Sequence, residues 1–156
     1  MNLIEGTLEH ENAHIRCRLG SQAIEIPETV FATRSRLRRQ IGSTVGVGIR
    51  PEGLSLRSST TQPTLTGNVV ISESLGFETL VYLDVDAKAV SRAEVFESLP
   101  DAAAGDRPST GDETSTTTLV ARLPAGTTVT EGESLALGID PTRLEFFDLE
   151  TGGAID

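Results

Sequence analysis

The sequence predicts an all-β fold made of two related lobes. Apolar and polar residues alternate with period two along most of the chain, which is typical of strands with one buried face. Glycine, proline and polar turn residues separate these stretches, and helical periodicity is scarce. A nine-residue pattern also occurs twice, about a third of the way along the chain and again near its end. Many short strands joined by turns favour a small barrel or sandwich, here in two copies.

The clearest strand is expected at 13–19, where Ile15, Cys17 and Leu19 share one face and polar residues share the other. Cys17 is therefore expected in the core. Turn residues follow it directly, at Gly20 and Ser21. Further strands are expected at 23–26, 44–50, 65–72, 79–86, 118–123, 134–139 and 143–147.

The repeated pattern is G-I-x-P-x-x-L-x-[LF], found at 48–56 and again at 138–146. Proline cannot continue a strand ladder, so Pro51 and Pro141 are expected to end one strand and turn the chain. The apolar pair that follows returns to the core. Each copy is thus predicted to be a strand, a corner and a second strand.

The chain is expected to divide into lobe 1 at approximately 1–57 and lobe 2 at approximately 64–156, forming one regulatory unit. The polar stretch between them has the composition of a linker. Residues 100–117 contain no large apolar side chain, which predicts a disordered insertion in lobe 2. A short helix is expected just before it, at 91–99.

Charge and cysteine content exclude several classes of protein. With 156 residues and a net charge of −10, the chain can bury its own core but should repel phosphate backbones and anionic membranes. Cys17 is the only cysteine, so no intrachain disulfide can form. The sequence shows no membrane span or signal peptide, and we expect a cytoplasmic protein. Lys88 is the only lysine, which fits either a GC-rich genome or a salt-adapted surface.

Catalytic motifs receive little support. His10 and His14 form a literal H-E-x-x-H, but a zinc site of this type needs a helix, and here a turn between two strands is expected. No Gly-Lys-[Ser/Thr] phosphate loop and no G-x-S-x-G elbow occur. We expect no enzyme activity, no metal and no bound cofactor in this chain.

Residues 32–40 hold the one basic cluster, with Arg34, Arg36, Arg38 and Arg39. Small β-barrels can bind oligonucleotides, but the stacking aromatic residues of such proteins are missing around the cluster, apart from Phe31. Nucleic-acid binding therefore stays a minor alternative, and a solvated basic loop is the simpler interpretation.

Phe146 and Phe147 are adjacent on a predicted strand, so their rings must point to opposite faces. One ring is expected in the core. The other faces a second layer, a partner or solvent, and interface contact and burial on both faces are equally supported.

Four ordered motifs resemble one family, the C-terminal regulatory region of the ATPase subunits of carbohydrate-type ABC importers, such as the maltose and glycerol-phosphate importers. Met1-Asn2 with Gly6 resembles the junction after the ATPase domain, and Gly48 to Glu52 resembles G-I-R-P-E. Residues 73–79 are similar to E-x-L-G-x-E-T, and residues 147–152 to F-D-x-x-T-G. The resemblance spans nearly the whole chain.

The resemblance implies two oligonucleotide-binding-type (OB, or TOBE) barrel lobes that exchange strands. It also implies a non-catalytic module that pairs with its copy in a second ATPase subunit. The partners would be a second copy, its own ATPase domain, indirectly the membrane permease subunits, and in some members a regulatory protein. ATP and Mg²⁺ would be bound by the ATPase domain, which this chain lacks, and the assembly would lie at the inner face of the cell membrane.

Residues of the four motifs are the candidates for structural corners or interface contacts: Gly48, Arg50, Pro51, Glu52, Glu73, Gly76, Glu78, Phe146, Phe147 and Asp148. The alternative function is oxyanion binding, since related TOBE modules hold molybdate between paired lobes. Backbone N–H groups and hydroxyls would bind such an ion.

Overall fold

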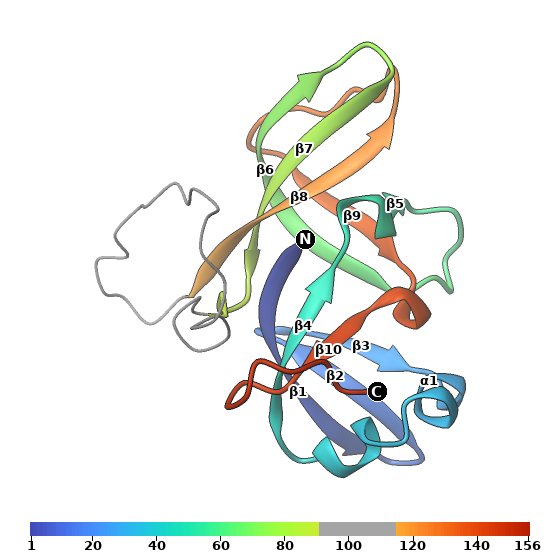
Figure 1. The fold of residues 1–156 in the computed structure, drawn as a ribbon. Coiled ribbons are helices and arrows are strands. Elements are labelled where there is room, and N and C mark those ends of the chain that lie inside the picture. The colour runs from blue at the N-terminus through green and yellow to red at the C-terminus, as the bar shows by residue number, and fades with distance from the viewer. Residues whose placement is uncertain (91–114) are drawn as a thin grey trace.

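The computed structural model describes residues 1–90 and 115–156, which form two five-stranded antiparallel sheets (Figure 1). The first sheet has the order β10-β4-β1-β2-β3, with strands β1 (Asn2–Glu11), β2 (His14–Leu19), β3 (Gln22–Ile26), β4 (Thr44–Ile49) and β10 (Glu145–Phe147). The second has the order β5-β9-β6-β7-β8, with strands β5 (Leu54–Leu56), β6 (Thr64–Ser74), β7 (Glu78–Asp86), β8 (Thr116–Pro124) and β9 (Ser134–Ile139).

The all-β prediction is confirmed, and the expected strands are found with small shifts at their ends. The structure adds one short helix, α1 (Glu28–Thr33), which the sequence analysis did not expect. Its buried residues, Val30 and Phe31, lie too close together to show a helical period. The helix expected at 91–99 and most of the insertion expected at 100–117 lie outside the described residues. Thr116 and Thr117 belong to β8.

The two copies of the repeated pattern carry the chain between the sheets in opposite directions. After β4 the chain passes through the 3₁₀ turn Pro51–Gly53 into β5, which belongs to the second sheet. After β9 it passes through the 3₁₀ turn Pro141–Arg143 into β10, which belongs to the first sheet. β5 pairs with β9, and β10 pairs with β4, each in antiparallel register. The predicted strand-corner-strand unit is thus confirmed at both places.

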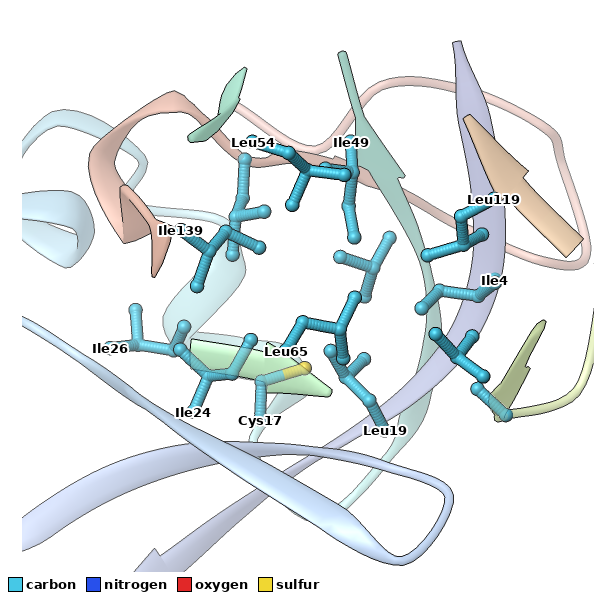
Figure 2. Packing of buried hydrophobic residues seen from close by; sticks show 14 of the residues in the cluster. Ile4, Cys17, Leu19, Ile24, Ile26, Ile49, Leu54, Leu65, Leu119 and Ile139 are labelled. Carbon is cyan, nitrogen blue, oxygen red and sulfur yellow. The ribbon is translucent and has the colours of Figure 1, made fainter. Parts of the chain in front are cut away.

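The inner faces of the two sheets share one hydrophobic core. Ile4 and Ile24 of the first sheet belong to the same buried cluster as Leu65, Leu119 and Ile139 of the second (Figure 2). Cys17 lies in this cluster with none of its surface exposed, as the alternation predicted. Burying one such aliphatic side chain contributes about 1.5–3 kcal/mol, so each lobe is stabilised by the side chains of the other.

A close backbone approach joins the turn after β2 to the end of β7. Gly20 has φ +59, and a Cβ atom added there would overlap the carbonyl oxygen of Asp86. Gly42 has a similar left-handed φ of +93, but a Cβ atom there would meet nothing within 4 Å. Alanine substitutions at the two glycines can therefore distinguish the cost of backbone strain from the cost of disturbing the contact between the lobes.

Gly20→Ala is expected to lower the free energy of unfolding by about 3 kcal/mol or more, because it adds a backbone clash to the strain of a positive φ. Gly42→Ala, the matched control, carries the strain alone and should cost about 1–2 kcal/mol. Urea unfolding of both variants measures the difference. Equal losses would contradict the proposed contact between Gly20 and Asp86.

Candidate functional site

Phe147 packs close to the first corner, on the face of β4 that carries Gly46 and Gly48. A Cβ atom at Gly48 would lie 2.9 Å from a ring carbon of Phe147 and 2.9 Å from the sulfur of Met1. Glycine at position 48 therefore makes room for the ring. Phe146 points the other way into the core with 2% of its surface exposed, whereas Phe147 is half-buried. The structure thus gives Phe146 a structural role and leaves part of Phe147 accessible.

Glu145 is the centre of a charged cluster beside this corner. Its two carboxylate oxygens lie 3.3 Å from a guanidinium nitrogen of Arg50 and 3.9 Å from one of Arg34. Arg34 also donates a hydrogen bond of 2.6 Å to the carbonyl of Leu144, and its guanidinium lies 5.7 Å from the centroid of the Phe146 ring. Arg34 is the least exposed of the three charged groups, at 19% of its side chain. This cluster fixes β10 against the first lobe.

The second corner is held by a side-chain cap and by a contact with the first corner. The carboxylate of Asp140 accepts hydrogen bonds from the N–H of Thr142 at 2.9 Å and from its hydroxyl at 2.6 Å. Arg143 donates to the carbonyl of Glu52 over 3.4 Å. The side chain of Glu52 itself is exposed, next to Pro51, which begins the 3₁₀ turn.

Two amide side chains of the first sheet bind the backbone of the second sheet. Asn2 accepts from the N–H of Val120 at 2.8 Å and donates to its carbonyl at 2.9 Å. Gln22 makes the same pair of bonds with Thr66, at 2.7 and 2.8 Å. Each amide therefore satisfies both backbone groups of one residue, as a neighbouring strand would. These clamps join the lobes at two strands, β8 and β6.

Asp148 closes the turn that follows β10. Its carboxylate accepts from the N–H and the hydroxyl of Thr151, at 2.8 and 3.0 Å, and from the N–H of Glu150 at 3.0 Å. These hydrogen bonds, those of Thr151 above all, hold the pKa of Asp148 below its usual value. The residues similar to F-D-x-x-T-G therefore form a side-chain-capped turn that leads to Gly152, which has φ +68.

The residues similar to E-x-L-G-x-E-T lie elsewhere, in the hairpin of β6 and β7 at the end of the second sheet farthest from the first (Figure 1). Gly76 takes φ +85 in the turn. Glu78 forms an ion pair with Arg122 at 2.7 Å, and Glu73 accepts from the hydroxyl of Tyr82 at 3.4 Å. The structure therefore does not bring Glu73, Gly76 and Glu78 to the corners.

The H-E-x-x-H residues lie on the hairpin of β1 and β2, as expected. His14 contacts Glu25 at 2.9 Å, and within residues 1–90 and 115–156 no group of three or more His, Cys, Asp or Glu side chains could hold a metal ion. In the basic cluster, Arg34 follows α1 directly, Arg36 precedes the 3₁₀ turn Leu37–Gln40, and Arg38 and Arg39 lie within that turn. Arg38 contacts Glu28 and lies 5.4 Å from the centroid of the Phe31 ring, so the aromatic residue nearest the cluster already has a cation above it.

A cleft of about 310 Å³ opens between the lobes, lined by Glu5, Thr7, Arg18, Asp86 and Lys88 among others. Lys88 lies 2.6 Å from Glu5, and Arg18 lies 2.6 Å from Glu9. Both cations of the cleft are thus balanced by carboxylates, and Asp86 adds a further negative charge. An anion gains little from such a lining.

The lobe junction brings together Gly48, Arg50 and Phe147 of the predicted candidates. Two features of the lobe junction were not predicted from the sequence. They are the clamps of Asn2 and Gln22 and the central position of Glu145 among the charged groups. An amide within an alternating strand is the only signal that the sequence offers, and it does not identify the strand to which the amide binds.

Comparison with known families agrees with this architecture. Residues 1–54 match the MalK OB fold domain, and residues 47–115 match the TOBE domain. The uncharacterized ABC transporter ATP-binding protein YurJ of Bacillus subtilis is 25% identical over 158 aligned residues, which cover 99% of this chain and 35% of that protein. The chain therefore spans about a third of the length of the curated relative it matches.

The exchanged β-lobes place the protein in the class of OB and TOBE modules. Residues 1–115 carry a MalK OB fold domain followed by a TOBE domain, the pair of lobes that the sequence motifs predicted. The matched domains do not include an ATPase domain. In the part of the chain that the structure describes, no helix has the length and apolar character needed to cross a membrane.

The hydroxyl of Thr151 is expected to contribute to the low pKa of Asp148. In Thr151→Val one of the hydrogen bonds to the carboxylate is lost, so the pKa measured by NMR titration should rise towards the ordinary value of about 3.9. Thr151→Ser keeps the hydroxyl and should keep the low pKa. Because the folded state has the lower pKa, the stabilisation by Asp148 is present above the unfolded value and is lost as pH falls through the folded value. An unchanged pKa in Thr151→Val would contradict this assignment.

Proposed function

We propose that this chain is the regulatory and dimerisation module of the ATP-binding subunit of an ABC importer for a carbohydrate or a related solute. The match to the OB and TOBE models over residues 1–115 is the main observation behind the proposal. In this assembly, the chain would act at the inner face of the cell membrane beside its ATPase domain and the permease subunits. ATP and Mg²⁺ would be bound by the ATPase domain.

The geometry supports a scaffold rather than a binding pocket. The amides of Asn2 and Gln22 join the two sheets of the chain, and Glu145 holds the exchanged strand β10 to Arg34 and Arg50. Such contacts produce a single body, and a module that keeps two subunits paired while their ATPase domains move needs that property. The resemblance of the sequence to the importer family supports the pairing role. The surface through which two copies pair is proposed as well.

Phe147 is the candidate interface anchor of this proposal, because its half-buried ring lies against Gly48, just before the corner at Arg50, Pro51 and Glu52. Aromatic residues and arginine are the side chains that most often dominate the binding energy of protein interfaces. A second copy of the chain would meet the same surface in a symmetric pair.

The proposal predicts a concentration-dependent dimer in sedimentation equilibrium. Phe147→Asp should weaken the dimer by about tenfold or more, because it removes an apolar anchor and adds a charge. Phe77→Asp, at the distant hairpin, is the matched control and should leave the dimer unchanged. Circular dichroism of both variants shows whether they are folded.

A chain that stays monomeric at high concentration and does not bind its ATPase domain would contradict the proposed function. If the folded Phe147→Asp variant still forms the dimer, the proposed function stands but the interface lies away from this corner.

Oxyanion binding is the second candidate, and the inter-lobe cleft is the place where it would occur. Its charge-balanced lining makes it the weaker proposal. Calorimetry with molybdate, tungstate and sulfate tests it directly, and the absence of heat would remove it.

A further inference from the structure

The hairpin of β6 and β7 carries an unusual concentration of exposed apolar side chains. Among the described residues, Val70, Ile71, Leu75 and Phe77 are four of the six large apolar side chains that are exposed. Phe77 is the most exposed of the six, at 75%. Single exposed apolar residues are common on protein surfaces, whereas a group of them on one element marks a contact surface.

A β-bulge places two of these side chains on the surface. Val69 pairs with Leu83 and Ile71 pairs with Tyr82, so Val70 is an extra residue in its strand. In a regular strand, Val70 and Ile71 would point to opposite faces, and one of them would reach the core. The bulge is held by the loop after β8, since Val69 exchanges hydrogen bonds of 2.9 and 2.7 Å with Glu133 and Gly132.

The tip of the hairpin has a defined shape. Gly76 takes a positive φ in the turn, and the N–H of Leu75 donates to the carbonyl of Glu78 at 2.8 Å. The ion pair between Glu78 and Arg122 joins the tip to β8. Phe77 is therefore presented on a fixed turn, and little conformational freedom is lost when its ring enters a partner.

Carboxylates surround this apolar group. Glu73 is exposed on the same hairpin, and Glu131 and Glu133 are exposed on the loop that binds Val69. Arg122, on the neighbouring strand β8, is already paired with Glu78. The tip is thus apolar at its centre and acidic at its border, and this border repels an anionic lipid surface.

A second copy of this chain offers a poor match for the tip. On the first lobe, the exposed arginines Arg36 and Arg39 lie on the 3₁₀ turn and at the residue before it. The first lobe shows only Met1 as a large exposed apolar side chain among the described residues. The first lobe therefore provides positive charge without an apolar surface to receive Phe77. On the second lobe, Leu56 is a single exposed side chain rather than a recess, and the guanidinium of the adjacent Arg57 already donates to the carbonyls of Ser59 and Thr60.

We propose that the tip of the β6–β7 hairpin, centred on Phe77, is the docking site for a different protein, one that presents an apolar recess bordered by lysine or arginine. The ring of Phe77 and the side chain of Leu75 fill the recess, and Glu73, Glu131 and Glu133 face the basic border. Complementary charges of this kind select the partner and speed its association. This surface is remote from the corner at Phe147, and the proposal does not depend on dimerisation there.

The first test uses a probe of the stated chemistry, a synthetic peptide of alternating arginine and leucine. Amide NMR shifts of the chain should change mainly at 70–78 and 131–133, and Phe77→Ser should weaken binding by about tenfold or more. Phe77→Leu keeps an apolar side chain and should retain most of the binding. A peptide with glutamate in place of arginine should not bind. Shifts scattered over all the surface carboxylates, or equal binding by Phe77→Ser, would overturn the proposal.

The second test finds the natural partner in the host cell. A photo-crosslinking benzoylphenylalanine at position 77 of the complete subunit should attach to another protein, through a peptide rich in lysine or arginine. The charge reversal of Glu131 and Glu133 to lysine should abolish that product, and the same crosslinker at Ser21, exposed on a distant turn, should not give it. A crosslink to a second copy of the chain, a crosslink to lipid, or no product would overturn the proposal. These outcomes are independent of the dimer measured at Phe147.

Discussion

The reciprocal exchange of strands at the two proline corners is the constraint on which the rest of the structure depends. The chain leaves the first sheet after Ile49 and enters the second, and it returns after Ile139. In each sheet, the strand by which the chain enters pairs with the strand from which the chain crosses to the other sheet. These pairs are β5 with β9 and β10 with β4. Neither sheet is complete without a strand from the other half of the sequence, so the lobes must fold together.

The exchange explains why polar contacts gather at the lobe junction. Short strands such as β10 and β5 provide few ladder hydrogen bonds, and additional contacts fix them in place. Glu145 and its arginines hold β10, while the amides of Asn2 and Gln22 and an antiparallel bridge between Ile4 and Ala89 join the two sheets. The exchanged strands and these contacts couple the two lobes. This coupling suits the proposed regulatory region, and it leaves the distant hairpin of β6 and β7 accessible to a partner.

Sequence reasoning recovered the strands and the corners because both depend on local rules. Period-two alternation placed Cys17 in the core, and Pro51 and Pro141 marked the corners since proline cannot continue a ladder. It did not find α1, whose buried face is too short to show a period, or the clamps, which depend on contacts more than forty residues apart. The exposed group at the hairpin was missed because Val69, Val70 and Ile71 look like an ordinary buried strand until the bulge is seen.

Unfolding followed by one native probe in each sheet tests the reciprocal exchange most directly. Cys17 in the first sheet is fully buried, and burial, with a smaller effect from Glu9, raises the pKa of its thiol to about 12, so its reaction with a thiol reagent reports opening of that sheet. The single tyrosine, Tyr82, lies in the second sheet and reports on it by fluorescence. If the exchanged strands make the lobes one cooperative unit, the two signals should change at the same urea concentration. Two separate transitions would contradict the account.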